Sequence, residues 1–233
     1  VDFDGDGQLD ILVVNDSNPQ LILFYNGDKS FDMIELPFVG PSVPSCGVGD
    51  IDGNGMIDIV CSTLSGRINI LMNHVGVPPN NLSGEDFFAA NFPGIPQDTV
   101  AIVAGPLVST DNYLNLVIGN FRQPNQLLRI SDEGSSSETI VLPGGSMETS
   151  CIVLTYFNED SAIDIFVGNI NGPNQILVNT GNGDFELIEI PDTDNIPTHA
   201  AASADMNNDG HMDLIIGNVR HLNQMRIWTA TDL

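Results

Sequence analysis

The chain has 233 residues, of which 42% are hydrophobic, and its 31 acidic against 6 basic side chains give a formal net charge of −25. The hydrophobic content excludes a disordered acidic tail, and the negative surface disfavours nucleic acid and anionic lipid as direct partners. No apolar run reaches the roughly 18 residues that a membrane-spanning helix needs, so no direct membrane insertion is expected.

An acidic phrase that runs into an apolar stretch recurs along the chain. The full copies span Asp2–Asp10, Asp50–Asp58 and Asp205–Asp213, and weaker copies end at Asn115 and Asp164. The five closing residues follow one another at intervals of 48, 57, 49 and 49 residues. A second phrase follows four of the apolar stretches and reads Asn18-Pro-Gln-Leu-Ile-Leu, Pro124-Asn-Gln-Leu-Leu, Pro173-Asn-Gln-Ile-Leu and Leu222-Asn-Gln-Met-Arg. Because the two phrases recur together, in the same order and at a similar spacing, the chain is a repeat protein.

Each repeat predicts four short strands. The first precedes the acidic loop, as in Val100–Ala104, Cys151–Thr155 and Ala200–Ala204. The second is the apolar stretch, the third opens at the Asn-Gln phrase, and a Gly-rich turn leads to the fourth, as in Phe185–Ile190. Four antiparallel strands at a period of about 49 residues describe a propeller blade. We therefore predict an all-β fold, a single β-propeller domain over residues 1–233, with repeats at approximately 1–40, 41–91, 92–142, 143–190 and 191–233.

The two ends of the chain leave the blade count open. The first repeat has no first strand and the fifth has no fourth strand, so the five visible repeats could belong to a larger ring. Val1 leads straight into an acidic loop, and we expect the true N-terminus, with any signal segment, to lie outside this sequence. A right-handed β-solenoid is the structural rival, although its turns are usually shorter than this period.

The acidic phrase has the composition of a calcium loop. Ca²⁺ prefers six to eight oxygen ligands, and an Asp-x-Asp-x-Asp-Gly-x-x-Asp loop offers side-chain oxygens at positions 1, 3, 5 and 9 and a backbone carbonyl at position 7. Glycine allows the loop to turn tightly. We predict three Ca²⁺ sites on this basis. Their ligands are Asp2, Asp4, Asp6, Gln8 and Asp10; Asp50, Asp52, Asn54, Met56 and Asp58; and Asp205, Asn207, Asp209, His211 and Asp213.

The other two loops have lost part of the ligand set. In the fourth repeat Tyr156 replaces the first acid, and a weaker fourth site remains at Asn158, Asp160, Ala162 and Asp164. In the third repeat Leu107 replaces the first acid, which leaves Ser109, Asp111 and Asn115, and no calcium is expected there. An Asx-rich turn without metal is the alternative for every loop.

An EF-hand can be set aside, although its first six positions match. The EF-hand loop carries Glu at position 12 and is flanked by helices. Position 12 is here Val13, Cys61 or Ile216, within an apolar run of β type. The acidic loops are therefore expected between strands.

The three cysteines and the two N-glycosylation sequons are relevant to whether the protein is secreted. Cys46 and Cys61 flank the second loop on adjacent strands, and symmetric pairing about residue 54 would place Cys46 opposite residue 62. A disulfide and a pair of buried thiols are both compatible with this placement, and we favour the disulfide. Cys151 is left unpaired as a core residue. N-glycosylation at Asn15 and Asn81 is expected only if a eukaryote secretes the protein.

The sequence contains no recognisable catalytic motif. There is no G-x-S-x-G, H-E-x-x-H, C-x-x-C or phosphate-binding Gly loop. The four histidines are scattered, and the calcium loops account for most of the acidic residues that a glycosidase pair could use. Tyr113, Phe121, Arg122, Tyr156 and Trp228 could contribute to a ligand face, but core packing explains most of them.

The two phrases together resemble the FG-GAP and VCBS repeats of integrin α-subunit propellers and of many extracellular bacterial and algal proteins. The resemblance covers essentially the whole chain. It implies a propeller, usually seven-bladed, in which calcium stiffens the blades and other loops recognise a ligand. We therefore expect an extracellular or cell-surface binding module that takes a protein or glycan ligand or assembles with itself as a fibre subunit. The alternative is a carbohydrate-active enzyme such as a polysaccharide lyase, or its non-catalytic propeller domain.

Overall fold

The computed structural model describes residues 1–15, 19–37, 43–63, 68–73, 87–92, 98–111, 114–131, 136–158, 160–191, 193 and 196–228. These residues form five antiparallel sheets. The first sheet contains β1 (Ile11–Val13), β2 (Leu21–Tyr25) and β3 (Phe31–Glu35); the second contains β4 (Cys46–Gly49), β5 (Asp58–Ser62), β6 (Ile68–Asn73) and β7 (Phe87–Phe92). The described part of the chain contains no helix that is long and apolar enough to cross a membrane.

The last three sheets repeat the same strand order. The third contains β8 (Thr99–Gly105), β9 (Asn115–Asn120), β10 (Gln126–Ser131) and β11 (Ser136–Val141). The fourth contains β12 (Thr149–Thr155), β13 (Asp164–Asn169), β14 (Gln175–Asn179) and β15 (Phe185–Glu189), and the fifth contains β16 (Thr198–Ala204), β17 (Asp213–Asn218) and β18 (Gln224–Arg226). The all-β prediction and its strand order are confirmed, and β7 ends one residue beyond the repeat boundary expected at residue 91.

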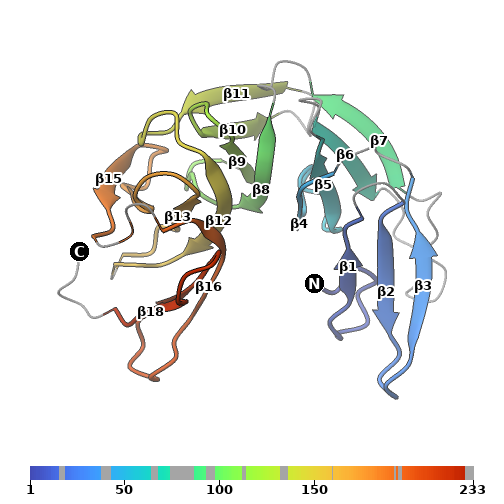
Figure 1. The fold of residues 1–233 in the computed structure, drawn as a ribbon. Coiled ribbons are helices and arrows are strands. Elements are labelled where there is room, and N and C mark those ends of the chain that lie inside the picture. Colours follow the sequence, from blue (N-terminus) through green and yellow to red (C-terminus); the bar gives the residue numbers. More distant parts are fainter. Residues whose placement is uncertain are drawn as a thin grey trace.

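The five sheets follow one another around an arc, with the first and the fifth at its two ends (Figure 1). The first strands of successive repeats contact one another, β4 with β8, β8 with β12 and β12 with β16. In the second to fifth sheets the acidic loop leads into the second strand, and in the first sheet it leads into the corresponding strand β1. This strand is buried on both faces in β9 and β13. This double burial explains why these strands read as continuous apolar runs.

The Gly-Asn and Asn-Gln phrases join neighbouring sheets. The Asn169 N–H donates to Asn174 Oδ1 (2.8 Å), and Asn174 Nδ2 donates to Thr198 Oγ1 in the next sheet (2.8 Å). Gly168 allows this close approach, because a Cβ there would lie 2.5 Å from Cys151 Sγ and 2.8 Å from Thr198 Cγ2. The second phrase is therefore a buried polar link between blades.

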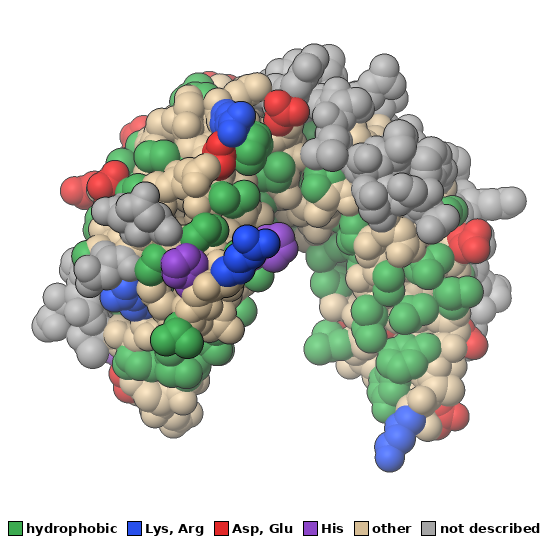
Figure 2. Space-filling model, viewed as in Figure 1, with side chains coloured by type: hydrophobic (Ala, Val, Ile, Leu, Met, Phe, Trp, Pro, Cys, Tyr) green, Lys and Arg blue, Asp and Glu red, His purple; other side chains and the backbone are tan. Residues whose placement is uncertain are grey.

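The sheets at the two ends expose residues that the inner sheets bury. Ile165 of β13 is 0% exposed, whereas its counterpart Ile11 of β1 is 46% exposed. Phe166 is 0% exposed, whereas its counterpart Ile215 of β17 is 41% exposed. Hydrophobic side chains accordingly gather on the first sheet in Figure 2. The alternation of side chains that packs sheet against sheet thus leaves an apolar face at each end of the arc.

Candidate metal centres

The acidic loops are tight turns whose shape is specific to the repeat. Positions 4 and 6 lie in the left-handed region in the first loop (Gly5, φ 76°; Gly7, φ 86°), as they do in the second. In the fifth loop Asn208 (φ 61°) and Gly210 (φ 92°) take these positions. Glycine and asparagine adopt this conformation at little cost. The loop is therefore curled toward its own centre, so that its acidic side chains converge.

In four of the five loops the closing residue is an aspartate whose carboxylate holds two segments of the blade together. Asp58 Oδ2 accepts the Ile51 N–H (2.7 Å), and its Oδ1 accepts the Asn73 N–H (2.8 Å). The same pair of hydrogen bonds, to the residues seven before and fifteen after, is made by Asp10, Asp164 and Asp213. Sequence reasoning assigned this position to metal binding alone and missed its second role, which the fixed spacing could have indicated.

Each of the first two loops brings three carboxylates together. One oxygen from each member of these groups lies within 4.8 Å of the others; the groups are Asp2, Asp4 and Asp10, and Asp50, Asp52 and Asp58. The buried Asp50 Oδ1 accepts no hydrogen bond from the residues that the structure describes. A divalent cation would supply the missing partner, so these residues fit the predicted ion.

The electrostatics of the second loop point the same way. Burial raises the pKa of Asp58 to about 6, and the neighbouring carboxylates of Asp52 and Asp50 add to the rise. In the first loop burial is likewise the largest cause of a raised pKa at Asp4. Negative groups held close together in a partly buried loop repel one another. A bound Ca²⁺ would remove this repulsion.

The remaining predicted ligands of these loops make hydrogen bonds within the loop. Asp6 Oδ1 accepts the Gln8 N–H (2.7 Å), and Asn54 Oδ1 accepts the Met56 N–H (2.8 Å). Asp6 lies outside the group of three carboxylates of its loop. Calcium binding through Asp6 and Asn54, or through the carbonyls of positions 7, stays a prediction.

The fifth loop has the same backbone conformation as the first two, but its acidic side chains are arranged differently. Asp205 accepts the Asp209 N–H at Oδ1 (3.1 Å) and the Gly210 N–H at Oδ2 (2.9 Å). Asn207 Nδ2 donates to Asp209 Oδ2 (2.8 Å), and the His211 N–H lowers the pKa of Asp209. Its acids do not form a group of three like those of the first two loops. Calcium binding at this loop remains a prediction.

The fourth loop keeps the closing bonds without the first acid. Tyr156 is 46% exposed at position 1, and Asp164 Oδ2 accepts the Phe157 N–H (2.8 Å). Asn158 Nδ2 donates to Asp160 Oδ2 (2.9 Å), and the Ala162 N–H donates to Asp160 Oδ1 (2.8 Å). These hydrogen bonds close the loop, and its weaker calcium site stays a prediction.

In the third loop the side chain of Arg129 pairs with the carboxylate of Asp111. Arg129 of β10 donates to both oxygens of Asp111, from Nε to Oδ2 (3.0 Å) and from Nη2 to Oδ1 (2.5 Å). The Arg129 guanidinium lowers the pKa of Asp111. The other repeats carry an apolar residue fourteen positions after the closing residue, at Phe24, Met72, Val178 and Ile227. This exception in the repeat was the signal that sequence reasoning missed.

Replacing Arg129 by Met, which stands at the corresponding position of the second repeat, should destabilise the protein by about 1–2 kcal/mol at pH 7. Asp111 has a lowered pKa in the fold, so the stabilisation is present above its ordinary value of 3.8 and is lost as pH falls through the lower folded pKa. Urea unfolding of both proteins at pH 7 and at about pH 3 measures this. A difference between the two proteins that is the same at both pH values would contradict the assignment.

The cysteines are paired with a register different from the expected one. Cys46 lies directly opposite Cys61 in the β4–β5 ladder, rather than opposite residue 62, because Gly49 pairs with Asp58 across the loop. The structure joins Cys46 and Cys61 by a disulfide, and Cys151 is free. Burial raises the pKa of the Cys151 thiol to about 11.

The structure describes some of the sequon asparagines and some of the aromatic residues considered for a ligand face. Asn15 Nδ2 donates to the Pro19 carbonyl (2.8 Å), a turn that Asn120 and Asn169 repeat, and glycosylation there stays a prediction. Asn81 and Tyr113 lie outside the described residues. Arg122 lies over the Phe121 ring at 4.8 Å, and Trp228 is 9% exposed.

Comparison with known proteins agrees with this architecture. A family model described as FG-GAP-like repeat matches residues 2–76 and 156–216. No curated protein matches the sequence. Among solved structures, BBS1N in complex with ARL6DN, soaked with lead, has a TM-score of 0.60 at 14% identity and covers 95% of this chain. Sqt1 of Saccharomyces cerevisiae has a TM-score of 0.60 at 13% identity and covers 92%.

The match extends over only part of those proteins. The chain spans 56% of the BBS1N chain and 57% of the Sqt1 chain. At these identities the likeness shows the fold alone. The family model, in contrast, covers more than half of this sequence, including the first two acidic loops and the fifth. The chain therefore belongs to the FG-GAP-like repeat family.

Proposed function

We propose that the chain is an extracellular, calcium-stabilised module that binds another macromolecule, with a protein as the favoured partner and a glycan or a further copy of itself as the alternatives. The observation that carries the calcium part is the pair of carboxylate groups in the first two loops, together with the unpartnered Asp50 Oδ1. Millimolar calcium outside cells suits loops of this kind, whose affinity is on the order of 10⁻⁴ to 10⁻³ M. The disulfide between Cys46 and Cys61 is in keeping with an oxidising compartment.

The binding part of the proposal rests on the family and on the chemistry of the surface. The chain belongs to the FG-GAP-like repeat family, and loops held by a scaffold of packed sheets are where binding residues are commonly found. A structural relative, BBS1N, was solved in complex with a protein. The net charge of −25 disfavours nucleic acid and anionic membranes, so neither is proposed as a partner. The role proposed for the chain is non-catalytic.

This function is tested by measuring binding of the chain to arrays of extracellular proteins and glycans. The measurement is made with calcium and again after chelation. We expect saturable binding to a member of one array that weakens after chelation, because the loops that stiffen the scaffold then repel their own charges. Light scattering at rising concentration measures self-assembly in parallel. Release of sugar fragments from a polysaccharide, with turnover, would overturn the non-catalytic role, and binding to neither array without self-assembly would overturn the function as a whole.

A further inference from the structure

The disulfide between Cys46 and Cys61 closes a covalent ring around the second acidic loop. The two cysteines are 15 residues apart in the sequence and lie directly opposite each other on β4 and β5. From this pair the ladder runs to Gly49 and Asp58, where it ends and the loop begins. All the ligands predicted for the second calcium site, from Asp50 to Asp58, therefore lie inside the ring.

The other blades show which contact the disulfide replaces. Each of the last three sheets has an apolar pair at this place of its ladder, three residues beyond the closing residue of the loop. These pairs are Ile102 with Ile118, Ile152 with Val167, and Ala201 with Ile216. The first two strands of those sheets thus pair without a covalent bond, so strand pairing alone does not account for the disulfide of the second sheet.

The second loop holds charges that a covalent ring keeps together. Asp50, Asp52 and Asp58 each place one carboxylate oxygen within 4.8 Å of the others, and like charges this close repel one another. In a loop without a cross-link, the repulsion is relieved when the two strands separate. The disulfide limits this movement, because it fixes the far end of a short ladder. A site preorganised in this way binds its ion at a smaller cost in chain entropy.

Reduction of the disulfide by a dithiol has a defined course. Cys46 is half-buried and Cys61 is 0% exposed, so the Cys46 sulfur is the accessible end. A thiolate of the dithiol attacks the Cys46 sulfur, the S–S bond breaks, and Cys61 leaves as a thiolate that takes up a proton. The second thiol of the reductant then displaces Cys46, which also leaves and is protonated, and the reductant closes to its own disulfide. Two electrons and two protons pass to the protein, and the second loop loses its covalent ring.

We propose that Cys46 and Cys61 are positioning residues of the second calcium site, whose disulfide raises the calcium affinity of this loop. By thermodynamic linkage, calcium bound there makes the disulfide harder to reduce by the same factor. The closure entropy of a ring of 15 residues limits this factor to roughly 150-fold. We expect about tenfold, because the strand ladder that remains in the reduced chain already restricts the loop. The inference rests on the proposed calcium binding and makes it dependent on the redox state of one blade.

The test is the redox equilibrium of the intact chain with dithiothreitol, in saturating calcium and in chelator. Alkylation followed by mass spectrometry gives the reduced fraction of Cys46 and Cys61 separately from the free Cys151. We expect calcium to lower the equilibrium constant for reduction about tenfold. Asp52→Asn, in the second loop, should lose most of this protection. Asp4→Asn, at the same position of the first loop, is the matched control and should keep it, because the first loop lies outside the ring.

Calcium affinity supplies the reciprocal measurement. Calorimetry of a chain with Cys46→Ala and Cys61→Val should show one site weakened about tenfold. The same two substitutions made together with Asp52→Asn should leave the remaining affinity unchanged. A reduction equilibrium that is the same in calcium and in chelator, or equal loss of protection in Asp4→Asn and Asp52→Asn, would overturn the proposal.

The melting temperature separates this inference from the proposed function. A chain that melts higher in calcium but is reduced equally with and without it would overturn the role of the disulfide and leave calcium binding standing. Neither a higher melting temperature nor heat of calcium binding would overturn calcium binding itself, and the role of the disulfide with it.

Discussion

Removing calcium should lower the melting temperature of the protein by about 10–20 °C when two loops are involved. A site whose ligand is present at about 100 times Kd adds about 2.7 kcal/mol to the free energy of unfolding. For a domain of this size each kcal/mol corresponds to about 2–4 °C. Thermal unfolding followed by circular dichroism, in calcium at about 100 times the measured Kd and then in excess chelator, measures the shift. An unchanged midpoint would contradict structural calcium binding.

The variant Asp52→Asn distinguishes metal binding from hydrogen bonding in the second loop. In chelator we expect this variant to be at least as stable as the parent, because one of the charges that raise the pKa of Asp58 is gone. In calcium the variant should be the less stable protein, because a carboxylate ligand is lost. Asp32→Asn, an exposed residue of β3 outside the loops, is the matched control and should change neither midpoint. A variant less stable than the parent under both conditions would indicate a purely structural turn.

Replacing Asp164 by Ala should destabilise the protein by about 2–4 kcal/mol, even in chelator. Asp164 is 0% exposed and accepts the N–H groups of Phe157 and Asn179, each at 2.8 Å. Its removal leaves two buried donors without acceptors, and each such donor costs about 1–3 kcal/mol. Asp164→Asn keeps one acceptor oxygen and should lose about half as much. Urea unfolding in chelator gives the free energies.

The control for this prediction lies in the same loop. Asp160 is exposed, and its Oδ1 accepts only the local Ala162 N–H (2.8 Å). Asp160→Ala should therefore stay within about 0.5 kcal/mol of the parent. Equal losses for Asp160→Ala and Asp164→Ala would mean that the buried hydrogen bonds are not what closes the blade.

The features that the sequence predicted are formed by residues that lie close together in the chain. The acidic loop, its glycines and the apolar strand after it lie within about fifteen residues, so their pattern alone predicted the strands and the groups around Asp2 and Asp50. The period of the repeat predicted the succession of sheets in the same way. Local hydrogen bonding and side-chain alternation depend on nearest neighbours in the chain, which a sequence displays directly.

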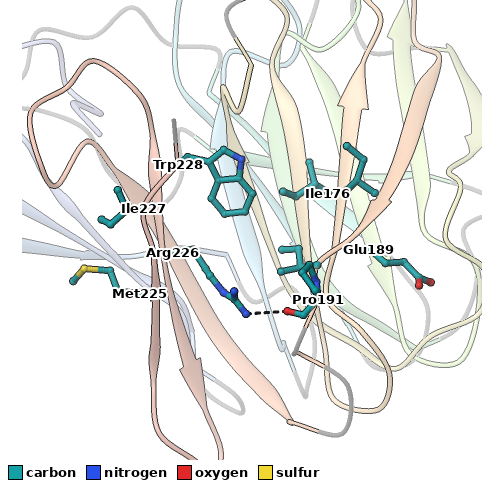
Figure 3. Close-up of a pocket in the computed structure, with 9 residues that line it drawn as sticks. Ile176, Glu189, Pro191, Met225, Arg226, Ile227 and Trp228 are labelled. Atoms are coloured by element: carbon teal, nitrogen blue, oxygen red, sulfur yellow. Dashed lines mark hydrogen bonds between the residues drawn. The ribbon is translucent and has the colours of Figure 1, made fainter. Parts of the chain in front are cut away.

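Tertiary structure decided the features in which distant segments meet. Arg129 reaches Asp111 because β10 pairs beside β9, and Asn179 Nδ2 donates to the Leu107 carbonyl 72 residues away (2.7 Å). Ile176, Pro191 and Trp228 line a groove where the described residues of the fourth and fifth sheets meet (Figure 3). The sequence by itself thus determined the blades and their candidate metal loops. Strand pairing within the third sheet determined that an arginine neutralises its loop, and packing between blades determined contacts such as that of Asn179 with Leu107, because both depend on how separate segments are brought together in space.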